Sequence, residues 1–463
     1  MKEKIIDRLA GKKIIILGFG REGHSTYKFI RKYFPESPLT IADKSNDLVL
    51  DSILPDRFLT VVKGDGYDRH LNDYDLIIKT PGINLSRIDY LVDPAKITSQ
   101  SDLFISAFSR QIIGITGTKG KSTTASLTYH ILKGASKNVL LAGNIGIPFL
   151  DIAEGIGEDT VVVAELSAHQ LEYTDASPHI AIMLNLYQEH LDHFASFSLY
   201  QEAKFNITHY QSQDDYLIYN ADDMYIPKWL NSHGLDRHFL PFSRNIMPDT
   251  GAFSYESQIL LLQNREKTGD FDLNDLPNLP GQHNYNNVMA SILACKLLEV
   301  DDETIYRELK TYRPLPHRME YIGTFRGIKF YDDSISTIPE ATMAAVKALK
   351  KVDTLILGGF DRGIEYGELI TFLSESQVTN VVFTGPAGKR IYLQWKESKK
   401  KLPSRFLLED DYPAIVEFAF RYTETGKICL LSPGASSYDR FRNFEERGTI
   451  YKNEVLQVGA VSQ

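Results

Sequence analysis

The chain has 463 residues, with 51 basic and 60 acidic side chains and a net charge of −9. Hydrophobic residues make up 43% and charged residues 24%, which excludes a disordered or fibrous protein, and the length predicts two to four domains. The acidic balance gives no reason to expect nucleic-acid binding, and two widely spaced cysteines without any long apolar stretch predict a cytoplasmic protein with no membrane insertion.

Short β-branched runs alternate with helical stretches in the N-terminal third. We predict strands at Lys13–Leu17, Leu39–Ala42 and Asp75–Ile78, and a helix that ends near Arg31. Strands that alternate with helices indicate a parallel sheet covered on both faces. Such sheets bind ligands at the carboxyl ends of their strands, where polar or glycine-rich clusters follow each predicted strand here.

A second α/β unit is predicted from position 111 onward. Its strands are Gln111–Ile115, Thr160–Ala164 and His179–Leu184, and a helix after His283 closes it. The polar, turn-rich stretch Asn231–Pro280 predicts a β-hairpin excursion from this unit.

One helix of this unit is predicted to begin at a capping box, Ser198-Leu-Tyr-Gln201. Its buried stripe would consist of Leu199, Ala203, Ile207 and Tyr210. Lys204 lies beside the stripe, so the residues alone predict that its side chain reaches water.

The segment Tyr312-Arg-Pro-Leu-Pro-His317 predicts a stiff linker, because its prolines are incompatible with a continuous helix. The α/β pattern then returns, with predicted strands at Lys329–Tyr331, Thr354–Leu357, Val381–Phe383 and Ile428–Leu431. We therefore predict an α/β protein with three domains, at 1–108, 109–313 and 314–463.

Two glycine-rich motifs follow predicted strands. Gly18-Phe-Gly-Arg-Glu-Gly23, with Asp43 further on, predicts a nucleotide site, although a tight strand-to-helix turn is the alternative. Gly117-Thr-Lys-Gly-Lys-Ser122 predicts a phosphate-binding loop in which Lys121 meets the phosphates and Ser122 holds Mg²⁺. The strict form of this pattern has glycine at position 115, which is isoleucine here.

Carboxylate and imidazole groups follow the next predicted strands of the same unit. Glu165 stands where a phosphate-loop protein places its metal-holding acid, and beside the loop this favours Mg²⁺ over a simple helix cap. Glu189-His-Leu-Asp-His193 offers further donors, with a solvated loop as the alternative. Zinc is a poor fit, because no thiol joins the cluster and the helical HExxH pattern is missing.

Hydroxyl, carboxylate and guanidinium groups follow the strands of the third unit, in Asp332-Asp-Ser334, Gly358-Gly-Phe-Asp-Arg362-Gly363 and Ser432-Pro-Gly-Ala-Ser-Ser-Tyr-Asp439. Such groups at adjacent strand ends suit a small carboxylated substrate, because guanidinium pairs with carboxylate. When each of them is taken alone, ordinary turn chemistry is the better explanation.

Six motifs in chain order resemble those of the Mur ligase family, which builds the peptide stem of bacterial peptidoglycan, and the resemblance covers essentially the whole chain. They are Gly117-Thr-Lys-Gly-Lys-Ser122, Glu165-Leu-Ser-Ala-His-Gln-Leu-Glu172, His190-Leu-Asp192, Leu279-Pro-Gly-Gln-His-Asn284 with Asn287, Pro316-His-Arg318 and Asn443-Phe-Glu-Glu-Arg-Gly448. The family has a Rossmann-like N-terminal domain, a central P-loop ATPase domain and a Rossmann-like C-terminal domain, which bind a UDP-sugar, ATP and an amino acid in that order.

The resemblance also implies site residues. For the UDP-sugar they are Gly18, Phe19, Gly20, Arg21, Asp43, Lys44, Thr80, Pro81, Gly82, Asn144 and His190. For ATP they are Gly117, Thr118, Lys119, Gly120, Lys121, Ser122, Thr123, Asn284, Asn287, Arg318 and Asp333. For the amino acid they are Thr337, Arg362, Ser437 and Phe444. For two Mg²⁺ ions they are Ser122, Glu165, His190 and Lys204, the last as a carbamate formed with CO₂. The implied catalytic residues are Lys121, His190, Lys204 and Arg318.

The implied reaction is the ATP-dependent addition of D-glutamate to UDP-N-acetylmuramoyl-L-alanine through an acyl phosphate, by a protein that we expect to be a monomer. Three positions depart from the family pattern. Lys119 replaces a usual asparagine, Ile335 replaces a lysine of many D-glutamate enzymes, and Arg362 replaces the lysine that commonly holds the glutamate carboxylate. Because two of these changes concern glutamate recognition, addition of L-glutamate, followed by a separate epimerase, is the alternative.

Two other classes of function account for parts of the sequence. An NAD-dependent oxidoreductase would use the N-terminal glycine motif and Asp43, but it leaves the phosphate loop, Glu165 and His190 without a purpose. A nucleotide-binding module without catalysis is hard to reconcile with a complete set of metal-binding and phosphate-binding groups.

Overall fold

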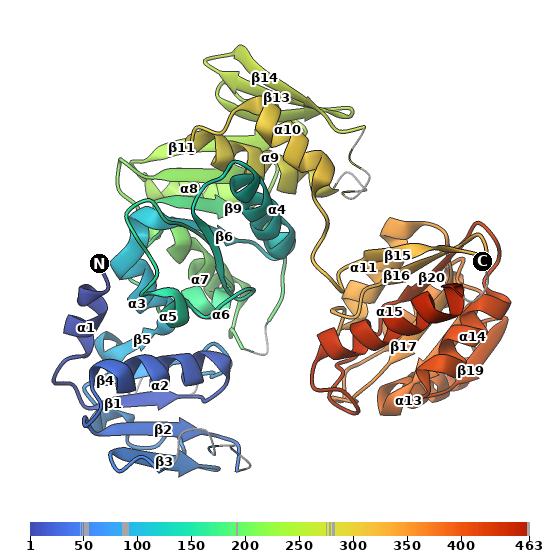
Figure 1. Ribbon diagram of the computed structural model, residues 1–463, viewed down its shortest axis with the longest axis horizontal. Coiled ribbons are helices and arrows are strands. Elements are labelled where there is room, and N and C mark those ends of the chain that lie inside the picture. The colour runs from blue at the N-terminus through green and yellow to red at the C-terminus, as the bar shows by residue number, and fades with distance from the viewer. Residues whose placement is uncertain are drawn as a thin grey trace. The chain divides into compact units, whose positions relative to one another are not determined.

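The computed structural model describes residues 1–46, 48, 50, 55–85, 92–190, 193–274, 276, 279 and 283–460. They form two compact units, Met1–Tyr312 and Arg313–Gln463. The first unit contains two α/β sheets and the second contains one (Figure 1). In the described part of the chain, no helix combines the length and the apolar character needed to cross a membrane.

The N-terminal sheet has five parallel strands. All four residues of its central strand are buried, because Ile14 and Ile16 pack into one core while Ile15 and Leu17 pack into another on the opposite face. Across the sheet the strands are β3 (Leu59–Lys63), β2 (Leu39–Asp43), β1 (Ile14–Leu17), β4 (Leu76–Lys79) and β5 (Ile97–Ser99). The helices of this region are α1 (Glu3–Leu9), α2 (Arg21–Tyr33) and α3 (Gln100–Phe108).

The central sheet has nine strands, of which those from β7 to β12 pair in parallel and the last three pair antiparallel. Across the sheet they are β14 (Glu266–Asp272), β13 (Gln258–Gln263), β12 (Gly251–Tyr255), β11 (His238–Ser243), β10 (Tyr216–Asn220), β9 (Ile180–Met183), β6 (Ile112–Thr116), β8 (Val161–Glu165) and β7 (Val139–Gly143). The predicted β-hairpin is confirmed, because β12, β13 and β14 pair antiparallel in sequence order, but these strands continue the central sheet and do not leave it as an excursion. Their weak hydrophobic pattern has a physical reason, since β11 and β14 keep much of their surface exposed.

Helices cover both faces of the central sheet. Side chains of α4, α9 and α10 form the core on one face, while α3, α5, α7 and α8 contribute to the core on the other. That second core continues into the N-terminal sheet, where Phe104 of α3 stacks on Phe149 of α5 with ring centres 4.8 Å apart. The helices are α4 (Lys121–Gly134), α5 (Phe149–Ile152), α6 (Ala168–Leu171), α7 (Phe197–His209), α8 (Ile226–His233), α9 (His283–Leu297) and α10 (Asp302–Thr311).

Helix α7 differs from its prediction in start and orientation. Ser196, two residues before the predicted cap, accepts the capping hydrogen bond from Leu199 N. Leu199 and Tyr210 are 47% and 48% exposed, whereas Lys204, expected to reach water, is 1% exposed. Ala203 and Ile207 of the predicted stripe are buried as expected, but the buried face of the helix is rotated away from Leu199 and Tyr210 and includes Lys204.

The second unit contains a six-stranded sheet, in which β15 is antiparallel to β16 and the other neighbours are parallel. Across it the strands are β15 (Glu320–Phe325), β16 (Ile328–Asp332), β20 (Ile428–Leu431), β17 (Val352–Gly358), β18 (Asn380–Thr384) and β19 (Arg405–Leu408). Helices α11 (Pro339–Leu349), α12 (Gly367–Glu375) and α13 (Gly385–Glu397) share one core with it, and α14 (Tyr412–Tyr422) and α15 (Phe444–Ala460) share another.

Each predicted domain range contains one of the three sheets, and the α/β class is confirmed. The first two sheets belong to one compact unit, so the boundary at 108/109 stays a prediction.

Candidate active site

The loop between β6 and α4 is the glycine-rich motif predicted to bind phosphate. Gly117 and Gly120 have φ values of 155° and 87°, which favour glycine, and a Cβ atom on Gly120 would lie 2.4 Å from Asn287 Oδ1. Lys121 begins α4, and its Nζ donates to the carbonyl oxygens of Gly117 at 2.9 Å and Thr118 at 3.1 Å. The loop thus combines a helix N-terminus with a lysine, as a phosphate site requires.

The two departures in this motif have their side chains engaged outside the phosphate loop. Ile115, where the strict pattern has glycine, is a buried residue inside β6. The exposed side chain of Lys119 forms an ion pair with Glu189. The loop backbone is fixed by Asn185, whose Oδ1 accepts from Lys119 N at 2.8 Å and whose Nδ2 donates to Lys119 O at 3.0 Å.

Glu165 ends β8 directly beside the loop, because it is in register with Ile115 of β6. Its side chain is 1% exposed, and its Oε1 accepts a 2.6 Å hydrogen bond from Asn144 Nδ2. Among the described residues, its Oε2 has no hydrogen-bond partner. An unsatisfied buried carboxylate oxygen is costly, and a cation would satisfy it. With the buried hydroxyl of Ser122 in α4, the donor set fits Mg²⁺.

The amine of Lys204 lies against the first residues of the phosphate loop. Its Nζ donates to Gly117 O at 2.9 Å and to Thr116 Oγ1 at 3.4 Å. Burial, reinforced by the nearby charge of Lys121, lowers the pKa of Lys204 well below its usual value. Its amine lies 4.9 Å from the ring centre of Tyr200, and the hydroxyl of that tyrosine is 3.0 Å from Thr118 Oγ1.

Three imidazoles gather next to this site. His190 follows β9 with a φ of 59°, and the His169 ring lies 4.9 Å from that of His190 and 4.3 Å from that of His193. Burial and the neighbouring imidazoles lower the pKa of His169 to about 3, so this ring is neutral at physiological pH. Glu172 Oε2 lies 3.1 Å from His193 Nε2 and accepts from Lys79 Nζ of β4 at 2.9 Å. Asp192 of the predicted cluster lies outside the described residues.

The N-terminal glycine motif is tightly packed at the carboxyl edge of its sheet. A Cβ atom on Gly18 would lie 2.1 Å from Thr80 Oγ1, and one on Gly23 would lie 2.4 Å from Gly18 O. Asp43 accepts hydrogen bonds from the backbone N–H groups of Phe19 at 2.7 Å and Ser45 at 2.8 Å. The predicted UDP residues Gly18, Phe19, Gly20, Arg21, Asp43, Lys44, Thr80, Pro81 and Gly82 all follow β1, β2 or β4 at this edge.

Arg21 links this edge to the central sheet. Its guanidinium donates to the carbonyl oxygens of Gly143 and Asn144 at 3.1 Å each and of Gly146 at 3.3 Å. Since Asn144 also holds Glu165, one chain of hydrogen bonds joins the predicted UDP-sugar residues to the predicted metal ligand.

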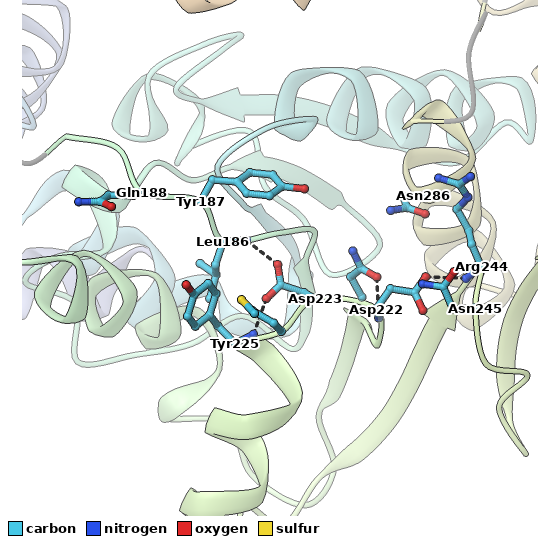
Figure 2. Close-up of a pocket in the computed structure, with 11 residues that line it drawn as sticks. Leu186, Tyr187, Gln188, Asp222, Asp223, Tyr225, Arg244, Asn245 and Asn286 are labelled. Atoms are coloured by element: carbon cyan, nitrogen blue, oxygen red, sulfur yellow. Dashed lines mark hydrogen bonds between the residues drawn. The ribbon is translucent and has the colours of Figure 1, made fainter.

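A cavity of about 420 Å³ opens at the same edge of the central sheet, over the ends of β9, β10 and β11 (Figure 2). Asn286, in the first turn of α9, lines it, and among the described residues the buried Oδ1 of its amide lacks a hydrogen-bond partner. In the same turn, Asn287 accepts from Thr124 Oγ1 at 3.2 Å and donates to Asn284 Oδ1 at 3.0 Å. The lining residues are Leu186, Tyr187, Gln188, Asn220, Asp222, Asp223, Met224, Tyr225, Arg244, Asn245 and Asn286.

In the C-terminal unit, Asp333 is buried just after β16. Its Oδ2 accepts from Ser336 Oγ at 2.6 Å and Ser432 Oγ at 2.8 Å, and its Oδ1 accepts from Met319 N at 3.1 Å. Burial raises the pKa of Asp333 to about 6, against the opposing effects of these hydrogen bonds and of nearby Arg318.

The predicted amino-acid residues also occupy strand ends. Arg362, after β17, donates to Thr337 O at 2.8 Å, and Ser437 is buried in the segment after β20. Phe444 begins α15, and its carbonyl oxygen accepts from Ser334 Oγ at 2.8 Å. Arg447, 1% exposed, donates to the carbonyl oxygens of Gly358, Ser334, Ala435 and Ser436 and so fixes the loops after β16, β17 and β20 together.

The structure therefore brings the predicted residues together within each unit. Sequence reasoning missed the roles of Lys79, His169, Tyr200 and Arg447, whose patterns look like ordinary strand or helix residues. Two signals were available: Lys79 is a charged residue at the end of an apolar strand, after Ile77 and Ile78, and Arg447 lies inside the motif Asn443–Gly448.

Comparisons with known proteins bear on these sites. Residues 115–295 match the family described as Mur ligase middle domain. A UDP-N-acetylmuramoylalanine--D-glutamate ligase of Thermoanaerobacter sp. (strain X514) is 30% identical over 459 residues, covering 97% of this chain and 99% of that protein. One from Bacillus thuringiensis (strain Al Hakam) is 32% identical over 454 residues, covering 97% and 98%.

Solved structures agree at the level of the fold. The UDP-N-acetylmuramate-alanine ligase MurC of Thermotoga maritima has a TM-score of 0.57 at 18% identity and covers 98% of this chain and 100% of that one. The MurF ligase of Thermotoga maritima in complex with ADP has a TM-score of 0.56 at 19% identity and covers 96% and 95%. The two relatives that are 30% and 32% identical over 97% of the chain show that it belongs to the Mur ligase family.

Proposed function

We propose that this chain is an ATP-dependent ligase that adds D-glutamate to UDP-N-acetylmuramoyl-L-alanine during peptidoglycan synthesis. The observation that carries the proposal is the convergence of the phosphate loop, Glu165 and Lys204 at one strand edge, in a chain about 30% identical over nearly its full length to ligases of that name. ATP and UDP-linked precursors are made in the cytoplasm, where we propose that the enzyme acts.

The chemistry explains why ATP is needed. A free carboxylate resists attack by an amine, because its leaving group would be oxide. Transfer of the γ-phosphoryl group of ATP to the terminal carboxylate gives an acyl phosphate and ADP. The glutamate amine then attacks the carbonyl carbon, loses a proton, and expels inorganic phosphate as the amide bond forms. The site must therefore hold two anions in contact, a carboxylate and a triphosphate.

We infer that the first unit supplies most of the neutralising groups. Lys121 and the N–H groups of residues 117–123 would bind the phosphates, because they lie at the N-terminus of α4, which favours anions. Ser122, Glu165, His190 and a carbamylated Lys204 would hold two Mg²⁺ ions. Bound Mg²⁺ supplies positive charge that screens the like-charged carboxylate and phosphate.

The cavity beside the loop suits the base of ATP. It lies over β9 to β11, on the opposite side of the phosphate loop from Glu165, so a nucleotide that extends away from Glu165 reaches it. The side-chain amide of Asn286 lines the cavity and would contact the base, and Asn284 and Asn287 hold the adjoining turn of α9. Arg318 and Asp333 of the other unit are proposed to serve the same nucleotide.

The remaining substrates are assigned to the two outer sheets. We propose that the segments after β1, β2 and β4 bind the UDP moiety and that Asn144 contacts the muramoyl part, which agrees with the bond of Asn144 to Glu165. Thr337, Arg362, Ser437 and Phe444 would bind glutamate. Arg362 would bind the glutamate carboxylate through its guanidinium group, where many enzymes of this type use a lysine.

One assay tests the function. The protein is incubated with ATP, Mg²⁺, UDP-N-acetylmuramoyl-L-alanine and either D-glutamate or L-glutamate, and phosphate release and product mass are measured. We expect release with D-glutamate and a product heavier by one glutamyl residue. The Lys121→Ala variant serves as the control and should lose turnover. No release with either enantiomer would reject the ligase assignment, and release with L-glutamate alone would reject the stereochemistry.

The carbamate on Lys204 needs its own test. Its amine is buried and its pKa is lowered, so the neutral form that adds to CO₂ is available. We expect ¹³C-labelled bicarbonate to give the protein a carbamate signal in NMR spectra that the Lys204→Met variant lacks. Lys137→Met, at an exposed lysine, is the matched control and should keep the signal. A spectrum of the wild type without this signal would contradict the carbamate while leaving the ligase function intact.

A further inference from the structure

A buried imidazole–carboxylate pair in the C-terminal unit takes no part in the proposed reaction. His317 Nδ1 lies 2.7 Å from Asp332 Oδ2, and these residues are 8% and 0% exposed. A carboxylate only accepts, so the imidazole donates from Nδ1. The hydrogen bond to Asp332 raises the pKa of His317 above its usual value, which favours the ion pair.

Each member of the pair is next in sequence to a residue that is proposed to bind ATP. His317 precedes Arg318, and Asp332 precedes Asp333. Arg318 lies between two residues with positive φ, His317 at 64° and Met319 at 47°, a backbone conformation that costs free energy for side chains of this kind. Such a conformation persists only where the surroundings fix it.

Several hydrogen bonds fix the backbone on both sides of Arg318. His317 N donates to Glu320 Oε2 at 3.0 Å, and His317 O accepts from Ile335 N at 3.1 Å. Met319 N donates to Asp333 Oδ1 at 3.1 Å. The strained turn is therefore hydrogen-bonded to the segment after β16. The His317–Asp332 pair adds a bond between two side chains to this connection.

Helix α15 packs against the pair at Gly448. A Cβ atom on Gly448 would lie 2.2 Å from His317 Nδ1 and 2.5 Å from Asp332 Oδ2. Phe444, which is proposed to bind the substrate glutamate, lies one turn earlier in the helix. Its ring is edge-on to the imidazole of His317, with ring centres 6.3 Å apart. The pair thus sits between the proposed ATP residues and the proposed amino-acid residues.

We propose that the His317–Asp332 pair is a positioning device that holds Arg318 and Asp333 in one fixed arrangement for the nucleotide. A cation site at the same place is disfavoured, because Glu320, the third nearby donor, already forms an ion pair with Lys452. The inference rests on the proposed function, since Arg318 and Asp333 matter to catalysis only if the chain uses ATP. His317 and Asp332 are positioning residues, which act through their neighbours.

The test compares three variants that break the pair in different ways. His317→Phe keeps the ring bulk but loses the donor, Asp332→Asn removes the charge, and Gly448→Ala places a methyl group against both atoms. Gln457→Ala, at an exposed position of α15, is the control. kcat, the KM for ATP and the thermal unfolding temperature are measured for each full-length protein, at a temperature where all are folded.

We expect each variant to lose at least roughly tenfold in kcat/KM for ATP, since a misplacement of about 1 Å in a catalytic group costs up to roughly a hundredfold. The double variant His317→Phe/Asp332→Asn should be no worse than the worse single variant, because both remove the same interaction. His317→Gln, which retains a side-chain donor, should recover part of the loss.

The outcomes separate this inference from the function on which it rests. An inactive wild type would reject the proposed function. An active wild type whose variants unfold at lower temperature but keep wild-type kcat and KM for ATP while folded would reject the positioning role and leave a purely structural pair. Additive losses in the double variant would also contradict a shared role.

Discussion

Single buried polar residues carry most of the information about this site. Glu165 and Asn286 each have a buried oxygen that lacks a partner among the described residues, whereas Arg447 and Lys79 are buried with hydrogen-bond partners for their charged groups. Burying a polar atom without a hydrogen-bond partner costs free energy, and a bound ligand can offset that cost. Residues such as Glu165 and Asn286 therefore indicate a binding site. Burial with a complete set of partners indicates support for neighbouring loops.

Asn286 provides a prediction at this scale. Replacing it with leucine removes a polar amide from the cavity lining without changing the groups that meet the phosphates. We expect the KM for ATP to rise about tenfold, which corresponds to about 1.4 kcal/mol for one lost hydrogen bond. kcat should stay close to the wild-type value, because the base is remote from the reacting atoms.

The steady-state rates that test Asn286 are measured against ATP at saturating UDP-sugar and glutamate. Asn231→Ala, at an exposed asparagine of α8, is the matched control and should leave both constants unchanged. An Asn286→Leu enzyme with an unchanged KM for ATP would show that the base binds elsewhere.

Strands and helices were predictable to the extent that their residues are buried uniformly. The predicted strand Ile428–Leu431 is confirmed with its exact ends, and Leu39–Ala42 and Thr160–Ala164 are confirmed to within one residue. All are strands with neighbours on both sides, so their sequences are continuous apolar runs. Strands β11 to β14 lie toward one edge of the central sheet, and β11 and β14 have many exposed residues that leave little hydrophobic pattern.

Helix α7 shows why the candidate site was harder to predict than the sheets. Three hydroxyl and aromatic residues near its start, Ser196, Ser198 and Tyr200, allow more than one cap and more than one buried face. The face that packs inward is decided by contacts with the phosphate loop, such as the hydrogen bond of Lys204 to Gly117, and these join residues 87 positions apart. Local patterns contain no information on such contacts, so only the family resemblance identified Lys204.

The whole molecule divides its chemistry between two compact units, Met1–Tyr312 and Arg313–Gln463. The phosphate loop belongs to the first and Arg318 to the second, yet the proposed reaction requires both to act on one ATP molecule. His317 is tied to its own unit by Asp332, Glu320 and Ile335, so we expect any hinge between the units to lie in the few residues just before it. Two prolines in that segment further restrict its backbone.

Ligand binding should therefore change the arrangement of the units about residues 313–316. We expect small-angle scattering of the wild type to give a smaller radius of gyration with a non-hydrolysable ATP analogue, Mg²⁺ and the UDP-sugar than without them, because productive binding requires groups from both units. Lys121→Ala, which should fail to hold the triphosphate, is the control and should scatter alike in both conditions. Identical wild-type profiles with and without these ligands, under conditions where binding is measured independently, would show that the units do not rearrange on binding.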